Sequence, residues 1–529
     1  MLQVEKKNYI VAIDLGSQNV TAAAATRGAD GKMVVEAVVR KPSGGVAGGA
    51  IENIDLAVKS LKEVVSELGE QLNIRVLEAY FGISGDFIRC ACHNDWVSVG
   101  DHNNGVSQSD VDELYARMEK VSAPTDDEII LERIPQNFMV DGNKEVPNPV
   151  GSFGQSLSST FNFILSTKTP IERLKKAAIN LGIRPLGIYI NPLVTAETLL
   201  LPDEKEEGVA VIDMGSNVTD VTIYYNNVIR YVASIPMGAN TINLDIRAQS
   251  IPEKVVEKIK VRFGSAMATN VDEGVMIDYR TPKGKKGILQ RNLATVIQAR
   301  VQDMADMVVE EIKFAGYEKK LPYGIVLTGG GANLADIAEA FTEHTKIDTR
   351  IGVPDVVVDE QSADLVDGPE FATIVGLLWR GMESGVACNF DLRPQAPRPT
   401  QSTQPVQPTQ PVQPRTMTQS QPVQPVQSKL NQQTPASAPA PQQPVQSKSA
   451  PTSAPSTATQ PTPATAPVSA TQHVEDQQPQ DQQGEQSQSQ QSAGESSGKK
   501  GGLFGKLTKF GKDLIDKIGT MSEPDDDII

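Results

Sequence analysis

Apolar residues near the N-terminus first gather in short runs and then recur at a helical spacing. The runs at 9 to 14, 20 to 26 and 34 to 40 are bounded by Gly, Pro, Ser or Asp, which is typical of buried strands. Five apolar residues downstream share one face of a helix: Leu56, Leu61, Val64, Val65 and Leu68. Three strands followed by an amphipathic helix predict an α/β fold.

One strand–turn–strand pattern occurs twice. Residues 8 to 25 read NYIVAIDLGSQNVTAAAA, and residues 208 to 225 read GVAVIDMGSNVTDVTIYY. We interpret them as two copies of one hairpin. An Asp-x-Gly-Ser turn exposes backbone N–H groups that suit phosphate oxygens, and an Asp at the strand end suits hydrated Mg²⁺. A single copy is more often an ordinary turn, but two copies in matching contexts favour a phosphate site.

Two further segments fit the same site. Residues 323 to 341 predict a buried strand, three glycines and an amphipathic helix capped near Asn333, and such a turn lets a ligand approach the backbone. Residues 252 to 264 predict a helix with Glu257 and Lys260 on one face. Taken alone, the glycines are equally typical of a helix start, and the Glu–Lys pair of a solvated surface.

Composition changes sharply towards the C-terminus. From about Pro394 to Ser497 the chain is mostly Gln, Pro, Ser, Thr and Ala, with QPVQ recurring. Such a segment cannot bury enough apolar surface to offset its chain entropy, so we expect it to be disordered. The folded part is therefore expected to be roughly the first 390 residues.

Charge and cysteine content exclude several classes of protein. The net charge is −16 (49 Lys and Arg against 65 Asp and Glu), with no stripe of Arg and aromatic residues, so nucleic acid is not an expected partner. The N-terminus lacks a signal-peptide core, and no run approaches the ~20 apolar residues of a membrane span. Three cysteines favour a reducing cytoplasm. Cys90, Cys92 and His93 lack a second ligand pair, so a pleated strand is favoured over zinc there.

The last thirty residues carry a separate signal. Residues 499 to 519 predict an amphipathic helix with six lysines against two aspartates, in an otherwise acidic protein. A basic amphipathic helix after a long tether is typical of one that lies in an anionic membrane surface; docking on the folded body is the alternative. The apolar arc and the flanking lysines are Leu503, Phe504, Leu507, Phe510, Leu514, Ile518, Lys506, Lys509 and Lys512.

The two hairpins, the Glu-x-x-Lys helix, MGAN at 237 to 240 and GGGAN at 329 to 333 together resemble the actin, heat-shock chaperone and sugar kinase superfamily. Within it the chain resembles the FtsA family of bacterial cell division proteins. The resemblance covers about residues 8 to 390 and the extreme C-terminus. It is carried by ISGDF (83 to 87), NPVG (148 to 151), IKVRFGSA (259 to 266), GIVLTGGGA (324 to 332) and ATIVGLL (372 to 378).

The resemblance implies an actin-like two-domain ATPase fold of the α/β class, with a nucleotide cleft and a family-specific inserted subdomain. It implies these parts: a first domain at 1–85 and 167–205, the inserted FtsA-type subdomain at 86–166, a second domain at 206–240 and 322–390, an adenosine-side subdomain at 241–321, a disordered Gln/Pro-rich linker at 391–498, the amphipathic helix at 499–519, and an acidic tail at 520–529.

The same resemblance implies an ATP site with Mg²⁺ held by Asp14 and Asp213 through water. Because the second loop has Gly-Ser-Asn where many relatives have Gly-Gly-Gly or Gly-Gly-Thr, at most a slow ATPase is expected. The implied contacts are Asp14, Gly16, Ser17, Gln18 and Asn19 in the first phosphate loop, Asp213, Gly215, Ser216 and Asn217 in the second, Gly238 after it, Gly329, Gly330 and Gly331 in the adenosine loop, and Glu257 and Lys260 at the base and ribose.

The implied function is that of a polymerising adaptor that anchors FtsZ filaments, the Z ring, to the cytoplasmic face of the inner membrane at the division site. The resemblance places the C-terminal peptide of FtsZ near Arg300, on a helix predicted from about Gln290 to Ala315. Other implied partners are further copies of the chain, the anionic membrane surface, and later division proteins through the inserted subdomain. A sugar kinase-like phosphotransferase is the alternative, but it gives the tail no role; a chaperone requires a β-sandwich, for which the Gln/Pro tract has no strand pattern.

Overall fold

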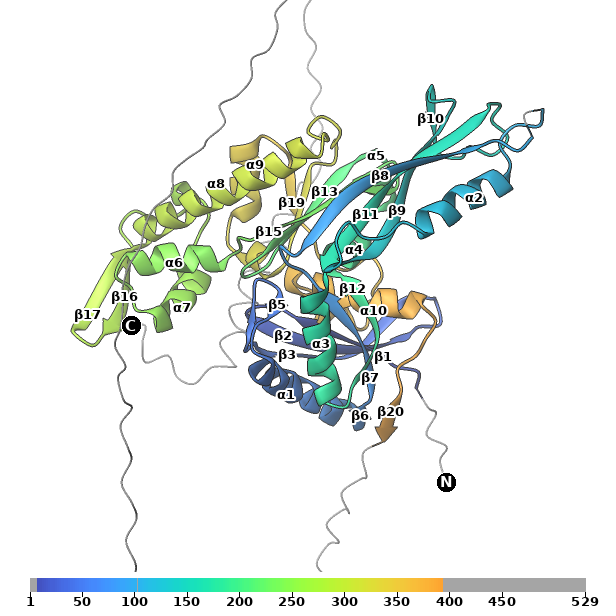
Figure 1. The fold of residues 1–529 in the computed structure, drawn as a ribbon. Coiled ribbons are helices and arrows are strands. Elements are labelled where there is room, and N and C mark those ends of the chain that lie inside the picture. Colours follow the sequence, from blue (N-terminus) through green and yellow to red (C-terminus); the bar gives the residue numbers. More distant parts are fainter. Residues whose placement is uncertain (1–6, 102, 393–529) are drawn as a thin grey trace, which may run out of the picture. The chain divides into compact units, whose positions relative to one another are not determined.

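Two five-stranded sheets of the same topology form the framework of the chain (Figure 1). The computed structural model describes residues 7–101 and 103–392. The predicted helix at 499–519, the acidic tail, and the predicted linker beyond residue 392 lie outside the described residues. In each sheet a central strand pairs antiparallel with the strand that follows it and parallel with the strand on its other side.

The first sheet has the order β12-β7-β1-β2-β3, and the second has the order β15-β14-β13-β18-β19. The runs predicted as strands at 9 to 14, 20 to 26 and 34 to 40 are confirmed as β1, β2 and β3, with ends shifted by one or two residues. The first sheet comprises β1 (Ile10–Leu15), β2 (Asn19–Arg27), β3 (Met33–Pro42), β7 (Glu78–Ile83) and β12 (Arg184–Ile190). The second comprises β13 (Val209–Met214), β14 (Thr219–Tyr225), β15 (Val228–Ile235), β18 (Ile325–Thr328) and β19 (Thr349–Ile351).

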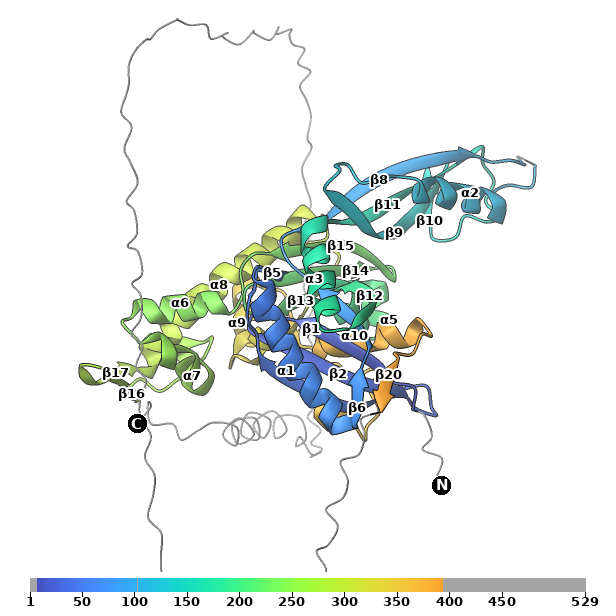
Figure 2. The ribbon, with the colours of Figure 1, turned by 60° about the horizontal axis from the view of Figure 1, so that its bottom comes forward.

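Helices cover both faces of the first sheet, which is why β1, β2 and β7 are buried along nearly all of their length. α1 (Ile54–Leu72) packs on β2 and β3 beside α3 (Lys168–Asn180), and α10 (Ala372–Glu383) packs on β1, β2 and β7 (Figure 2). The expectation that Leu56 belongs to the buried face of α1 is wrong, because this side chain is 51% exposed. Leu56 lies five residues, or about 140° around the helix, from the buried Leu61 and so falls off the apolar stripe.

Between β7 and β12 the chain builds a separate four-stranded antiparallel sheet with the order β10-β9-β11-β8, and α2 (Gln108–Glu119) packs on it. Figure 1 shows α2 running along this sheet. The apolar periodicity of this region is weak because β9 is only half-buried along most of its length. Cys90 and Cys92 lie on β8, as the strand prediction required. The strands are β8 (Ile88–Ser98), β9 (Glu128–Val140), β10 (Lys144–Val146) and β11 (Ser156–Thr167).

A second insertion lies between β15 and β18. The helices predicted at 252 to 264 and from about Gln290 to Ala315 are confirmed as α7 and α8. The long helix α8 buries a continuous apolar stripe that includes Leu293, Ile297 and Val301. The elements are α6 (Asn240–Ala248), α7 (Glu253–Phe263), β16 (Met276–Thr281), β17 (Gly284–Leu289) and α8 (Gln290–Phe314).

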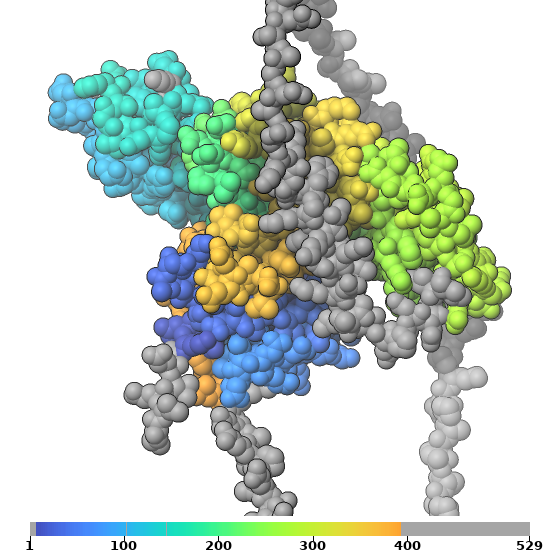
Figure 3. Space-filling model, turned by 180° about the vertical axis from the view of Figure 1, so that it is seen from behind, coloured from blue at the N-terminus to red at the C-terminus, as the bar shows by residue number. Residues whose placement is uncertain are grey.

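The helix α4 (Asn191–Glu197) joins the two sheets, because it contacts β12 of the first sheet, β13 and β14 of the second, and α10. The last described residues return to the N-terminal half, where the strand β20 pairs with β6 in a separate two-stranded sheet. Figure 3 shows this segment in orange against the blue N-terminal region. No helix in the described part of the chain is long and apolar enough to span a bilayer. The remaining elements are α5 (Pro202–Glu207), α9 (Ile337–Thr345), β4 (Val46–Ala47), β5 (Ala50–Ile51), β6 (Ile74–Val76), β20 (Phe390–Leu392) and short 3₁₀ turns at Ala268–Asn270, Gly330–Asn333, Ala363–Leu365 and Pro369–Phe371.

Candidate functional site

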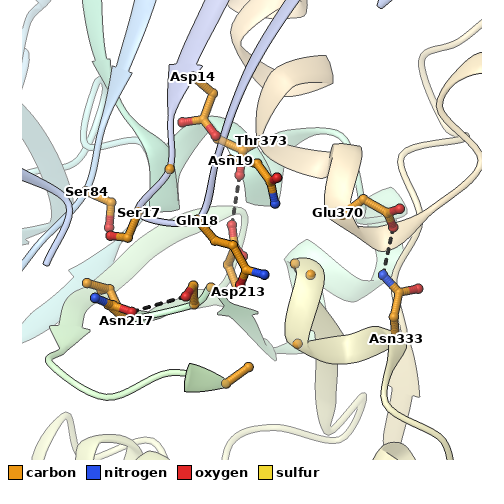
Figure 4. A pocket seen from close by; sticks show the side chains of 18 of the residues that line it. Asp14, Ser17, Gln18, Asn19, Ser84, Asp213, Asn217, Asn333, Glu370 and Thr373 are labelled. Carbon is orange, nitrogen blue, oxygen red and sulfur yellow. Dashed lines mark hydrogen bonds between the residues drawn. The ribbon is translucent and has the colours of Figure 1, made fainter. Parts of the chain in front are cut away.

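A cavity of about 420 Å³ lies where the β1–β2 and β13–β14 turns approach each other (Figure 4). It draws its lining from both sheets and from α7. All but one of the residues predicted to contact a nucleotide line it, namely Asp14, Gly16, Ser17, Gln18, Asn19, Asp213, Gly215, Ser216, Asn217, Glu257, Lys260, Gly329, Gly330 and Gly331.

The exception is Gly238, which does not line the cavity. A Cβ atom on Gly238 would stand 2.6 Å from the carbonyl oxygen of Gly215. The next two residues donate backbone hydrogen bonds to this loop, from Ala239 to the Gly215 carbonyl and from Asn240 to the Ser216 carbonyl. Gly238 therefore lets α6 close against the second loop.

The two hairpin turns share one geometry. A Cβ atom on Gly16 would stand 2.7 Å from the carbonyl oxygen of Asn19, and one on Gly215 would stand 2.8 Å from that of Val218. Side chains at these glycines would therefore force the turns open. The N–H of Gly215 donates to Val218 across the turn at 2.9 Å, so this amide closes the turn rather than facing the cavity.

Two buried carboxylates stand at the ends of the paired central strands. The amide of Asn191 donates to Asp14 at 3.0 Å, and the hydroxyl of Thr373 donates to Asp213 at 2.8 Å, with Thr195 a second donor to Asp213 at 3.4 Å. Asn191 and Thr195 are one turn apart on α4. One short helix thus orients both aspartates.

A third carboxylate, Asp220, was missed by the sequence reasoning. It lies opposite Asp213 in the β13–β14 register and accepts hydrogen bonds from Ser84 at 2.5 Å and from Ser234 at 2.6 Å. Its signal was present in the sequence, since a tight hairpin pairs the residue at its strand end with one seven positions later. Ser84 belongs to the first half of the chain, so this hydrogen bond crosses the cavity between the two halves.

The three acids share an electrostatic environment that disfavours their charged forms. Burial and, to a smaller extent, the charge of Asp213 raise the pKa of Asp14 to about 6 and that of Asp220 to about 7. Burial also raises the pKa of Asp213. A cation placed among these groups offsets the repulsion.

The side of the cavity opposite the hairpins is formed by α7 and the glycine loop. Lys260 and Glu257 form an ion pair at 2.9 Å, and Asn243 donates to Glu257 at 2.5 Å. Gly329 has a φ of +82°, and a Cβ atom there would collide with the carboxylate of Asp213, so only glycine fits this turn.

The helix expected directly after these glycines begins later. A 3₁₀ turn spans Gly330–Asn333, and α9 begins at Ile337, after Asp336 in the left-handed conformation. The Asn333 side chain does not cap the helix and instead donates to Glu370 at 2.8 Å (Figure 4). Further lining residues that were not among the predicted contacts include Thr21, Arg40, Ser84, Asn191, Asp220, Glu370 and Thr373.

Comparison with known proteins gives matches over most of the described chain. The family model for cell division protein FtsA matches residues 210–376, and the model for the SHS2 domain inserted in FtsA matches residues 85–165. FtsA of Pseudomonas aeruginosa is 28% identical over 386 residues, covering 72% of this chain and 91% of that protein. FtsA of Neisseria meningitidis serogroup B is 29% identical over 378 residues, covering 71% of this chain and 90% of that protein.

The chain belongs to the FtsA family. Its fold is the actin-like α/β fold, and the SHS2 match coincides with the four-stranded sheet and α2 that stand between β7 and β12. Among solved structures, the PilM-PilN type IV pilus biogenesis complex aligns with a TM-score of 0.48 and 15% identity, over 70% of this chain and 98% of that chain.

In this FtsA-family chain, Arg300 lies on α8 away from the cavity. Its guanidinium contacts Asp245 of α6 at 2.5 and 3.1 Å and Asp303 of its own helix at 3.1 Å. The side chain is 26% exposed. The positive charge of Arg300 is therefore already engaged inside the subdomain, and a peptide can reach it only by sharing or exchanging those acids.

Proposed function

We propose that this FtsA-family protein binds Mg-ATP in the cavity between its two halves and acts as a polymerising adaptor for cell division. The observation that carries the nucleotide proposal is the pair of aspartates, Asp14 and Asp213, which occupy equivalent positions of two equivalent hairpins and line one cavity. Two turns that face one space can hold a chain of phosphates between them.

The residues present fit a magnesium nucleotide. The cavity of about 420 Å³ lies within the usual range for small-molecule sites, ~300–1,000 Å³. Magnesium prefers one or two carboxylates together with waters and phosphate oxygens, and Asp14 and Asp213 supply such carboxylates. When bound, the metal neutralises charge on the phosphates. Glycine at 16, 215 and 329 lets the turns that line the cavity pack tightly against neighbouring carbonyl and carboxylate oxygens of the chain.

Different residues along the cavity would contact or position different parts of the nucleotide. Asn191 and Thr373 fix the two carboxylates, while Glu257 and Lys260 lie on α7, where they can contact the ribose and base. Because Asp220 and Ser84 join the two halves through the same cavity, an occupant of the cavity can influence how the halves close. We propose that filament formation by this protein requires ATP binding rather than rapid ATP hydrolysis.

The adaptor role rests on the FtsA family and on the C-terminal sequence. Each lysine near an anionic leaflet contributes about 1 kcal/mol, and each fully buried apolar side chain up to ~1.5–3 kcal/mol, so one basic amphipathic helix binds reversibly. Many copies on a polymer bind tightly through effective concentration. We therefore propose that a filament of this protein attaches FtsZ filaments to the inner face of the membrane at the division site.

Liposome co-sedimentation tests the adaptor proposal. The full chain should sediment with anionic vesicles, more so with ATP, whereas a chain that ends at Gly498 should remain in solution. The double variant Phe504→Glu and Phe510→Glu should lose binding, because it puts charges into the apolar arc. Lys509→Glu with Lys512→Glu keeps the arc and should weaken binding and its salt dependence. Normal recruitment of the double Phe variant would overturn the proposal.

The partner end of the adaptor is tested at Arg300. We propose that it binds a carboxylate of the FtsZ C-terminal peptide, so Arg300→Glu should abolish peptide binding and leave ATP binding intact. Asp245→Asn is the matched variant, because it keeps the arginine and removes its principal acid, and it should strengthen peptide binding. Wild-type peptide affinity in both variants would remove Arg300 from the interface.

A further inference from the structure

Arg40 and Asp14 lie in one row of the first sheet, that is, in a line of directly paired residues across β1, β2 and β3. The register pairs Asp14 of β1 with Thr21 of β2, and Thr21 with Arg40 of β3. Side chains of directly paired residues on adjacent strands point to the same face of the sheet. All three line the cavity. The next residue, Lys41, points the other way and pairs with Glu67 of α1 at 2.7 Å.

The cavity holds more acids than bases. Among the described residues that line it, the acids are Asp14, Asp213, Asp220, Glu257 and Glu370, and the cations are Arg40 and Lys260. Lys260 is paired with Glu257 on α7. Arg40 is therefore the cation that stands on the hairpin side, beside the proposed magnesium carboxylate.

The partner of Arg40 belongs to the other half of the chain. One guanidinium nitrogen lies 3.7 Å from a carboxylate oxygen of Glu370, and the arginine side chain is 36% exposed. The other oxygen of Glu370 accepts the hydrogen bond from Asn333. A second guanidinium nitrogen lies 3.7 Å from the position that a Cβ atom would take on Gly330. The Arg40–Glu370 pair is thus long and half-exposed, and it spans the cavity at the glycine loop.

We propose that Arg40 binds the terminal phosphates of the nucleotide and exchanges Glu370 for them when the nucleotide binds. Asp14 would hold the magnesium that neutralises charge on the phosphates, and Arg40 lies in the same row of the sheet as that carboxylate. The planar guanidinium binds phosphate through two parallel hydrogen bonds, which a single contact at 3.7 Å to Glu370 does not match. Arg40 would then make affinity depend on the number of phosphates.

The proposal rests on the proposed nucleotide function and is tested by calorimetry on the full chain with Mg-ATP, Mg-ADP and AMP. Arg40→Ala should weaken binding of ATP and ADP by about ten- to a hundredfold, because a hydrogen bond to a charged group is lost, and should leave AMP unchanged. Arg40→Lys keeps the positive charge but not the planar guanidinium, so its affinity for ATP and ADP should lie between those of the wild type and Arg40→Ala. Glu370→Gln keeps an oxygen for Asn333 and removes the competing charge, so ATP affinity should rise about two- to fivefold.

Lys41→Ala is the matched control, since it removes one positive charge from the neighbouring position outside the cavity, and its ATP affinity should equal that of the wild type. An Arg40→Ala protein that loses ATP and AMP affinity equally has a damaged fold. The titrations of Arg40→Lys with the three nucleotides then decide whether Arg40 contacts the phosphates. If Asp14→Ala and Asp213→Ala abolish ATP binding while Arg40→Ala and Arg40→Lys bind all three nucleotides normally, the Arg40 proposal is overturned and the nucleotide site stands. If the aspartate variants also bind normally, the nucleotide site itself is wrong.

Discussion

The two halves of the molecule repeat one backbone but not one chemistry. In the first sheet, the row that crosses β1, β2 and β3 reads Asp14, Thr21 and Arg40, and in the second the equivalent row across β13, β14 and β15 reads Asp213, Asp220 and Ser234. The aspartate on the central strand is common to both. The neighbouring positions differ, since one row ends in a cation and the other carries a second buried acid.

This difference shows which parts of the repeat the fold requires. The hairpin turn needs its glycine, because a side chain at Gly16 or Gly215 would meet the same backbone carbonyl in either half. Strand pairing does not fix the residue type at the second and third positions of each row. Thr21, Arg40 and Asp220 line the cavity, and Ser234 donates a hydrogen bond to Asp220. At those positions the two equivalent sheets can therefore carry different residues that make different contacts with one ligand.

The largest expected effect tests what the two rows share. Asp14→Ala and Asp213→Ala should each weaken Mg-ATP binding by at least about tenfold, as expected for groups that hold a metal through its waters. Isothermal titration calorimetry measures the affinity. Glu67→Ala is the control, because it removes an acid from the surface of α1. Equal losses support equivalent roles for the two halves, whereas normal affinity in both variants contradicts the two-hairpin site.

A smaller effect should distinguish how the two aspartates are held. Asp213 accepts hydrogen bonds from two hydroxyls, Thr373 and Thr195, while Asp14 accepts one from the amide of Asn191. We expect Asn191→Ala to weaken Mg-ATP binding about tenfold and Thr373→Ala only a few-fold, because Thr195 remains as a donor. The same titrations measure both variants. A larger loss in Thr373→Ala would mean that the second row, not the first, carries the more sensitive contact.

The sequence predicted the local framework of this site and missed its long-range contacts. Strands β1 to β3, both hairpins and the helices α7 and α8 follow from short patterns of apolar residues and turn residues, which are local signals. Most site residues predicted from motifs lie within or beside the turns, and Glu257 and Lys260 lie on α7. Asn191 and Thr373 reach their aspartates from 177 and 160 residues away along the chain, and no local pattern carries that information.

Two other errors have different physical causes. The helix after the glycine loop was placed too early, because Asn333 resembles a capping residue but its side chain is taken by Glu370. The helical spacing of apolar residues places Leu56 on the buried face, but its angular position puts it outside the stripe of α1. Asp220 could have been found by pairing the hairpin strands on paper, since the register places it opposite Asp213. Arg40 could not, because the β2–β3 register shifts between Ala24 and Ala25, and an unbroken register would pair Thr21 with the residue before Arg40.

The smallest expected effect concerns the acid that only the second row has. The pKa of Asp220 is raised to about 7, mainly by burial, whereas an aspartate in the unfolded chain titrates near its ordinary value of ~3.9. Between these values the folded state holds a proton that the unfolded state has released, so the stability of the metal-free protein should fall as the pH rises from about 4 to about 7.

Replacing Asp220 by Asn should remove this part of the pH dependence, because the amide carries no charge. Its oxygen can accept from one of the two serines, and its N–H can donate to the hydroxyl oxygen of the other. With EDTA and without nucleotide, thermal unfolding should show similar midpoints for the variant and the wild type near pH 4, and a higher midpoint for the variant near pH 8. Thr21→Ser, at the equivalent position of the first row, is the control and should leave the pH profile unchanged. A wild-type profile in Asp220→Asn would mean that the second acid is ionised at no cost in the folded protein, and the two rows would then be electrostatically alike at this position.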